Sequence, residues 1–460
     1  MPSKQHRDPG HSQSERDVTR TPKQRRRAAW HGRAAWRTVR NGARRLIGKL
    51  PLPDEDRESI DFSAPSVPYY TDLSRRFRLA QLILYVVLFV FLVAAVLGSR
   101  ERITYANLYY LVKDINAASH MAEEAADQLD YSISTVSPAM TRYRGGLVIV
   151  GDNEVTVLSG SGRQTLHAQV NYATPAVAAS EKYFLTYGRG ETSFSLFNAF
   201  TRIHSETTEY PVYGAAVADD GSFILLTRSA KYTSRVVFYD RFCKVRASYY
   251  LTGYALSVTV SPSGDFAAVS SVEDVNGHMT SKVNLFRLTG TISNETVTVE
   301  NTLASLCAFT AADRVAIVCP DRLIVLRTDA SVQADIRLEG NEPDLCTVFS
   351  GRIALLKKNS LQNGEKSGTA TIRVLDKNGK DVYTADVKTD AEPTALAFGG
   401  NVLYVRANGY LYRLSGDGRV VTETRIRRDT LAILPDGNGS VLVCSPAYAS
   451  RYYTRDFTDT

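Results

Sequence analysis

An unbroken apolar run covers residues 79–97, LAQLILYVVLFVFLVAAVL, with one amide side chain, Gln81, and no charged residue. As a helix this run would be about 28 Å long, close to the thickness of the hydrocarbon core of a bilayer. A helix packed in a soluble domain would show a polar face over that length, and this run shows none. We therefore predict a single transmembrane helix over residues 79–98.

More basic residues lie directly before this apolar run than directly after it. Arg75, Arg76 and Arg78 stand directly before it, at the end of a tail that is rich in arginine. Lys and Arg near the ends of a span are retained in the cytoplasm, so we expect the N-terminus inside and the large C-terminal part outside. The run lies far from the N-terminus and no small-residue cleavage site follows it, which favours an uncleaved signal-anchor.

Residues 1–78 form the predicted cytoplasmic tail. They hold 18 Lys and Arg against 9 Asp and Glu, a net charge of +9, whereas the whole chain carries +7. The rest of the chain therefore carries −2, and the basic character belongs to the tail alone. For that reason we predict no nucleic-acid partner. Residues 1–24 contain almost no large apolar side chain, so most of the tail is expected to be disordered.

Residues 25–50 differ from the rest of the tail, because apolar side chains recur there at helical spacing and arginines fill the other positions. This pattern predicts an amphipathic helix that binds anionic lipid at the membrane surface. The alternative is a solvated basic stretch that only sets the topology, and nucleic-acid binding by this segment is a third and least favoured option. The residues predicted to contact the membrane surface are Arg25, Arg26, Arg27, Trp30, Arg33, Trp36, Arg37, Arg40, Arg44 and Arg45.

Residues 100–132 have helical composition and are predicted to form a short stalk. Their apolar positions alternate three and four apart, which is the 3.5-residue period of a coiled coil. The seam consists of Thr104, Leu108, Leu111, Ile115, Ala118, Ala122, Ala125 and Leu129. The stalk is either a dimerising coiled coil or a connector that lies against the next domain. Its short length and its alanines favour the connector, and the oligomeric state stays open.

From residue 136 to residue 460 the pattern changes to short β-branched and aromatic runs separated by Gly, Asp and Asn. Residues 215–227, AAVADDGSFILLT, align with residues 258–270, VTVSPSGDFAAVS, as strand, turn and strand. Such units recur roughly every 40 residues with about four strands each, which is typical of β-propeller blades. We predict an all-β fold, an extracytoplasmic β-propeller.

The spacing predicts seven blades, with eight as the nearest alternative and a two-sheet sandwich third. The units are expected to start near residues 140, 174, 212, 254, 302, 342 and 392. The predicted strands 430–434 and 440–444 are followed by no further strands with which they could form a unit of their own. The first predicted unit, near residue 140, is short of an inner strand. Pairing the end of the chain with its beginning would remove two exposed edges, so we predict ring closure of that kind.

The five cysteines fall within strand patterns. Cys307 and Cys346 occupy equivalent repeat positions, and so do Cys319 and Cys444. Repeat-equivalent positions favour buried thiols that act as small apolar residues. The alternative is a disulfide between Cys307 and Cys319, which the oxidising environment outside a cell would allow.

No catalytic or metal-binding motif stands out in the outer domain. The sequence has no HExxH, no Cys/His cluster and no GxSxG, and both of its tryptophans lie in the tail. Paired carboxylates such as Asp219 and Asp220 fall in a turn between two strands and are interpreted as turn formers. We therefore predict no cofactor, no metal and no catalytic residue.

The outer domain is rich in tyrosine. These side chains either line a binding face, where tyrosine adds a large contact area, or pack between blades. Packing is the more common case for strand residues. The tyrosines concerned are Tyr249, Tyr250, Tyr254, Tyr404, Tyr410, Tyr412, Tyr448, Tyr452 and Tyr453.

The basic tail, the single span, the segment from Asn107 to Asn116 and the Trp-free blades resemble an uncharacterised family of membrane-anchored, propeller-like proteins of Gram-positive, clostridia-type bacteria. The resemblance implies a bacterial cell membrane with the propeller facing outward, and no assigned activity. We expect a binding or scaffolding module for a protein or cell-envelope partner, not an enzyme. The alternatives are a propeller hydrolase or lyase with a site at the channel mouth, and a transmembrane sensor.

Overall fold

A computed structural model describes two compact units, Met1–Tyr109 and Tyr110–Thr460. The predicted amphipathic helix and its membrane-contact residues lie outside the described residues, and so does most of the predicted stalk. The described residues are 67–98, 125–133, 135–338, 340, 342–359, 368–436 and 439–453.

The first unit contributes one helix, α3 (Val67–Gly98), which includes the whole predicted span. Its apolar side chains from Leu82 to Val90 are each 52–66% exposed, on every side of the helix. In the described part of the chain, no helix is long and apolar enough to cross a membrane. The transmembrane assignment of residues 79–98 stays a prediction.

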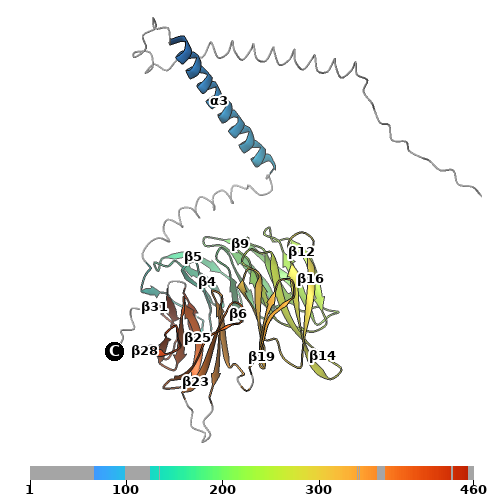
Figure 1. The fold of residues 1–460 in the computed structure, drawn as a ribbon, viewed down its shortest axis with the longest axis vertical. Coiled ribbons are helices and arrows are strands. Elements are labelled where there is room, and N and C mark those ends of the chain that lie inside the picture. Colours follow the sequence, from blue (N-terminus) through green and yellow to red (C-terminus); the bar gives the residue numbers. More distant parts are fainter. Residues whose placement is uncertain are drawn as a thin grey trace, which may run out of the picture. The chain divides into compact units, whose positions relative to one another are not determined.

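The described residues of the second unit form β-strands that pair antiparallel in sheets (Figure 1). The first four-stranded sheet consists of β2 (Ala139–Tyr143), β3 (Gly146–Val150), β4 (Glu154–Leu158) and β5 (Gln164–Gln169). A seven-stranded sheet follows, with β6 (Pro175–Ala179), β7 (Phe184–Gly188), β8 (Glu191–Phe197), β9 (Arg202–Val217), β10 (Phe223–Thr227), β11 (Ser234–Tyr239) and β12 (Val245–Leu251).

Four more four-stranded sheets come next along the chain. The first two consist of β13 (Tyr254–Val260), β14 (Phe266–Val275), β15 (His278–Arg287) and β16 (Ser293–Glu300), and of β17 (Leu306–Ala311), β18 (Arg314–Val318), β19 (Arg322–Arg327) and β20 (Val332–Arg337). The second two consist of β21 (Leu345–Phe349), β22 (Arg352–Lys358), β23 (Thr369–Asp376) and β24 (Asp381–Lys388), and of β25 (Pro393–Gly399), β26 (Val402–Ala407), β27 (Tyr410–Leu414) and β28 (Val420–Arg425).

The last sheet joins the two ends of the unit. It contains β29 (Ala432–Pro435), β30 (Ser440–Cys444), β31 (Tyr448–Tyr453) and, at its outer edge, β1 (Gln128–Asp130). The prediction that the end of the chain pairs with its beginning is therefore confirmed, since β31 pairs with β1. We had expected the C-terminal strands to complete the first unit, and this expectation is wrong. The strands β2 to β5 already supply the four strands of that unit.

The stalk prediction is wrong at its C-terminal end. Leu129 fits the predicted helical seam, but it lies in the middle of β1, pairs with Ala449 and is fully buried. The β-domain thus begins at Gln128 and not at residue 136. Pairing with β31 overrides the local helical pattern. Without β1, the strand β31 would lie at the edge of the last sheet with unpaired backbone groups.

The long strand β9 belongs to two groups of four strands. Its first part pairs with β8, as in the pair Leu196 and His204, and its last part pairs with β10, as in the pair Ile224 and Ala216. The chain therefore passes from one group to the next without a loop.

The first strand of each group lies beside the first strand of the next group. This series closes on itself, because β29 also lies beside β2. The strands in this ring are β2, β6, the last part of β9, β13, β17, β21, β25 and β29.

The core lies between neighbouring sheets. Middle strands such as β3, β10 and β30 are buried at every position, because a neighbouring sheet covers each of their faces. This explains their continuous apolar sequences. Outer strands such as β20 alternate between exposed and half-buried positions. Leu356 of β22 and Phe398 of β25 belong to one hydrophobic cluster, which joins two neighbouring sheets.

All five cysteines are free thiols. Cys307, Cys319 and Cys444 are buried, as predicted, and burial raises the pKa of each to about 12. The alternative disulfide between Cys307 and Cys319 is absent. Cys346 departs from the prediction, because it is exposed on the inner strand β21.

Candidate interaction surface

Exposed aromatic side chains lie near the ends of β9, β12 and β13 and in the loop before β11. Tyr232 in the loop before β11 and Tyr250 at the end of β12 lie in ring contact, with centroids 5.1 Å apart. Tyr213 lies in the last part of β9, Tyr254 at the start of β13, and Leu256 follows on β13. These five side chains are 38–62% exposed, and we call them the tyrosine surface.

Hydrogen bonds from the loop between β10 and β11 hold this surface in place. The backbone N–H of Arg228 donates to the carbonyl of Pro211 in β9 (3.3 Å). The hydroxyl of Thr233 donates to the carbonyl of Thr252 (2.6 Å), in the turn between β12 and β13. Both ends of the loop are thereby fixed to its neighbours, so the tyrosines are presented on a rigid support.

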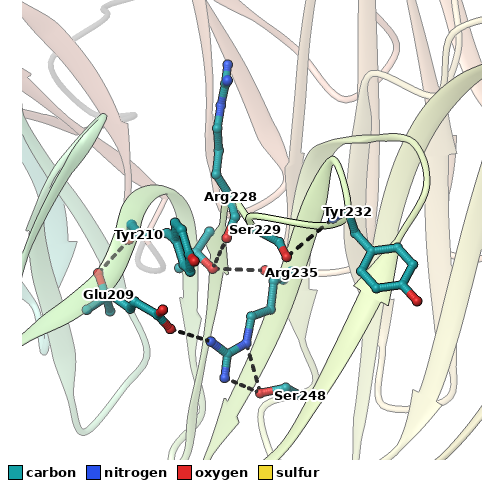
Figure 2. Close-up of polar contacts among 9 residues, drawn as sticks. Glu209, Tyr210, Arg228, Ser229, Tyr232, Arg235 and Ser248 are labelled. Carbon is teal, nitrogen blue, oxygen red and sulfur yellow. Dashed lines mark hydrogen bonds and ion pairs between the residues drawn. The ribbon is translucent and has the colours of Figure 1, made fainter.

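Basic side chains accompany the tyrosines. The Arg235 guanidinium donates two hydrogen bonds to Ser248 Oγ (3.1 and 2.8 Å) and lies 3.8 Å from Glu209 Oε2 (Figure 2). It also stands 5.7 Å from the centre of the Tyr250 ring. These contacts fix Arg235 in one orientation, with its charge against an aromatic face.

Two further cations border the same surface. Arg228 stands 5.6 Å from the Tyr213 ring, and Lys231 stands 5.7 Å from the Tyr232 ring. Figure 2 shows the Arg228 side chain pointing away from Arg235. The tyrosine surface therefore combines aromatic area with positive charge.

A carboxylate supports the turn beside Tyr254. Glu273 Oε2 accepts a hydrogen bond from the Thr252 hydroxyl (2.5 Å), and Glu273 also forms an ion pair with Lys282. The hydrogen bond from Lys282, followed by that from Thr252, holds the pKa of the Glu273 carboxyl below its usual value. The pKa of the Tyr210 hydroxyl is raised instead, mainly by its hydrogen bond with Glu209.

The tyrosines named from the sequence divide into three sets. Tyr250 and Tyr254 lie on the tyrosine surface, as a binding face requires. Tyr404 and Tyr412 are buried between sheets, as the packing alternative required, and Tyr249 packs on Phe286 with ring centroids 5.1 Å apart. Tyr410, Tyr448 and Tyr452 line a separate pocket, and Tyr453 is half-buried in β31.

Sequence reasoning missed Tyr213, Tyr232, Arg228 and Arg235. A signal was present, because the segment 228–235, RSAKYTSR, places basic and aromatic residues between two apolar strands. Elsewhere in the described residues, no group of three or more His, Cys, Asp or Glu side chains lies together in a way that could hold a metal ion.

Solved structures share this architecture at low identity. Sqt1 from Chaetomium thermophilum matches with a TM-score of 0.50 and 12% identity, over 71% of this chain and 98% of that chain. BamB from Moraxella catarrhalis matches with a TM-score of 0.48 and 10% identity, over 72% and 99%. Apo AztD from Citrobacter koseri matches with a TM-score of 0.48 and 12% identity, over 63% and 86%. The likeness to Sqt1 shows the fold, a β-propeller.

The sequence comparisons add one assignment. No curated protein matches the chain. Residues 122–450 match one family model. This range includes β1 to β30 and the first residues of β31. The chain belongs to the family of unknown function DUF5711.

Proposed function

We propose that the protein is a binding or scaffolding module, a β-propeller that captures a protein or cell-envelope partner through its tyrosine surface. The observation that carries this proposal is the exposure of four tyrosines and Leu256 in two neighbouring groups of strands, with cations beside three of the rings. Exposed apolar area of this kind marks interaction sites when several large side chains share one surface, and Tyr232 and Tyr250 are in direct ring contact. Tyrosine and arginine are also the residue types that dominate binding energy in protein interfaces.

We count eight blades in this propeller. Six four-stranded sheets supply six of them, and the seven-stranded sheet supplies two that share β9. The closed series of eight inner strands supports this count. The sequence-based prediction favoured seven blades over eight because the strands after residue 430 were assigned to the first unit.

We further propose that α3 anchors the propeller in a bacterial cell membrane, with the N-terminus in the cytoplasm and the propeller outside. The exposed apolar side chains from Leu82 to Val90 support this location, because lipid would cover them on every side. Arg75, Arg76 and Arg78 directly before the apolar run support the orientation.

Site-specific photo-crosslinking in native membranes tests the binding role. A photoreactive residue would replace Tyr254 on the tyrosine surface in the full-length chain. A matched control would replace Val332, which is similarly exposed on the outer strand β20 of another sheet. We expect a discrete adduct from position 254 and none from position 332. A Tyr232→Ser and Tyr250→Ser variant should lose the adduct.

Two outcomes would contradict this role. Identical adducts from positions 254 and 332 would indicate non-specific collisions in the membrane. The absence of any adduct at position 254, in cells that express the intact chain, would show that the tyrosine surface carries no partner.

A further inference from the structure

A second concave site lies between the edge of the sheet that contains β27 and β28 and the strand β31 of the last sheet. Its volume is about 590 Å³, within the range of roughly 300–1,000 Å³ that small-molecule sites occupy. It is formed by a different part of the ring from the tyrosine surface. Its lining residues are Gly409, Tyr410, Arg425, Ile426, Arg427, Arg428, Tyr448 and Tyr452.

Backbone contacts hold the three arginines at this pocket. Arg425 ends β28 and pairs with Tyr410 across the strands. The next residues are fixed, because the Ile426 N–H donates to the Gly409 carbonyl (2.8 Å) and the Thr430 hydroxyl donates to the Arg427 carbonyl (2.6 Å). The pocket wall is therefore part of the fold and not a free loop.

The charges of the lining residues do not balance. Asp429 forms a two-point ion pair with Arg427, with distances of 2.7 and 2.5 Å, and this pairing keeps the pKa of the Asp429 carboxyl below its usual value. Arg425 and Arg428 have no carboxylate partner among the described residues. The pocket thus holds two uncompensated positive charges beside one neutral pair.

The tyrosines give the pocket an aromatic wall. The Tyr448 ring lies 5.8 Å from the Arg427 guanidinium, so one face of the ring is held against a cation. Tyr410 and Tyr452 also line the pocket. A ligand here would meet both positive charge and ring surfaces with hydroxyl groups, and the volume leaves room for more than a bare ion.

We propose that this pocket binds an organic phosphate monoester, with the phosphate at Arg425 and Arg428 and the organic part against the tyrosines. A phosphate monoester carries close to two negative charges at neutral pH, which matches the two uncompensated arginines, whereas a single carboxylate carries one. The planar guanidinium also fits phosphate oxygens in a two-point contact. The proposal is independent of the function assigned to the tyrosine surface.

Calorimetric titration of the full-length protein in neutral detergent tests the proposal. The probes are glycerol 3-phosphate, a soluble form of phosphatidic acid with short acyl chains, and inorganic phosphate. We expect saturable binding of at least one of the two esters, and weaker binding of inorganic phosphate because it lacks the organic part. Preference for the lipid would identify a membrane headgroup as the source of the ester, and preference for glycerol 3-phosphate would identify a soluble ligand.

Variants at exposed arginines locate the site. Arg425→Gln and Arg428→Gln should each weaken binding roughly tenfold, because each removes one charged hydrogen-bond donor. The control is Arg419→Gln, which removes an exposed arginine from the turn between β27 and β28. All three arginines are exposed, so the variants are expected to fold. A control variant that weakens binding as much as the other two, or no binding of either ester by the wild type, would overturn the proposal.

Discussion

The Arg451 side chain in β31 and the Asp436 side chain after β29 form a buried ion pair, with 3.1 Å between Nε and Oδ2. Only 3% and 7% of the two side chains are exposed. The same carboxylate lies 3.0 Å from Arg142 Nε in β2. The Arg451 guanidinium also donates to the carbonyls of Ala126 and Gly145, at 2.8 and 2.9 Å. This cluster therefore joins the segment directly before β1, the first complete sheet and the last sheet where the ring closes.

Breaking this pair should destabilise the propeller strongly. Arg451→Met leaves the Asp436 carboxylate buried with one cation fewer, and loss of one partner of a buried pair typically costs about 3–5 kcal/mol. The control is Arg373→Met, which breaks the partly exposed pair with Asp381 and should cost about 1 kcal/mol or less. Urea unfolding followed by circular dichroism measures both. Equal losses in the two variants would contradict a closing role for Arg451.

The strand β1 should be essential although it has only three residues. Leu129→Asp would place a charge at a fully buried position and release β1 from β31, so the unfolding midpoint should fall sharply. Val136→Asp is the matched control, because Val136 is 89% exposed on the segment before β2. If both variants keep the wild-type midpoint, Leu129 does not hold the ring closed.

Thiol reactivity should follow burial. The pKa values of Cys307, Cys319 and Cys444 are raised to about 12, so almost no thiolate exists at pH 7.5, and burial also blocks access. A maleimide reagent should therefore modify the exposed Cys346 first in the native protein. The Cys346→Ser variant should lose this fast phase, and urea should expose the buried thiols. Fast labelling of Cys307 in the native state would contradict the packing described here.

The turn beside the tyrosine surface should weaken in acid. The pKa of Glu273 is lowered in the folded state, so its stabilising contribution is present above the unfolded pKa of about 4.3. That contribution is lost as the pH falls through the lower folded value. The difference in unfolding free energy between the wild type and Glu273→Gln should therefore shrink from pH 7 to pH 3. A difference that does not change with pH would assign its origin to packing and not to charge.

Protease accessibility checks the proposed topology. Protease added to intact protoplasts should digest the propeller and leave the tail before the apolar run protected. Tags at the two ends of the chain would report both outcomes in one experiment. Protection of the propeller together with digestion of the tail would reverse the orientation inferred from Arg75, Arg76 and Arg78.

Much of the fold could be predicted from the sequence, because the middle strands of a propeller have a distinct pattern. The continuous apolar runs of β10 and β30 follow from burial on two faces, and the predicted starts near residues 174, 212 and 254 agree with the innermost strands. The role of residues 128–130 could not be predicted, since three residues that fit a helical period form a strand only through a partner more than 300 residues away.

The tyrosine surface was only partly predictable for a different physical reason. Tyr250 and Tyr404 both stand in short strands, yet Tyr250 lies on the outer strand β12 and is exposed, whereas Tyr404 lies on the middle strand β26 and is buried. The difference depends on whether a neighbouring sheet covers that edge, and the local sequence does not contain this information. The Arg235 contacts likewise come from Glu209 and Ser248, which belong to two other strands.

The continuous strand β9 connects the tyrosine surface directly to two groups of four strands. In most of the ring a turn connects one group of strands to the next, and such a turn can bend when one group moves. Between the two groups that share β9 the connection is a hydrogen-bonded strand, so a force applied at Tyr213 is carried directly into both groups. A load applied to this surface would therefore be shared by two groups of four strands.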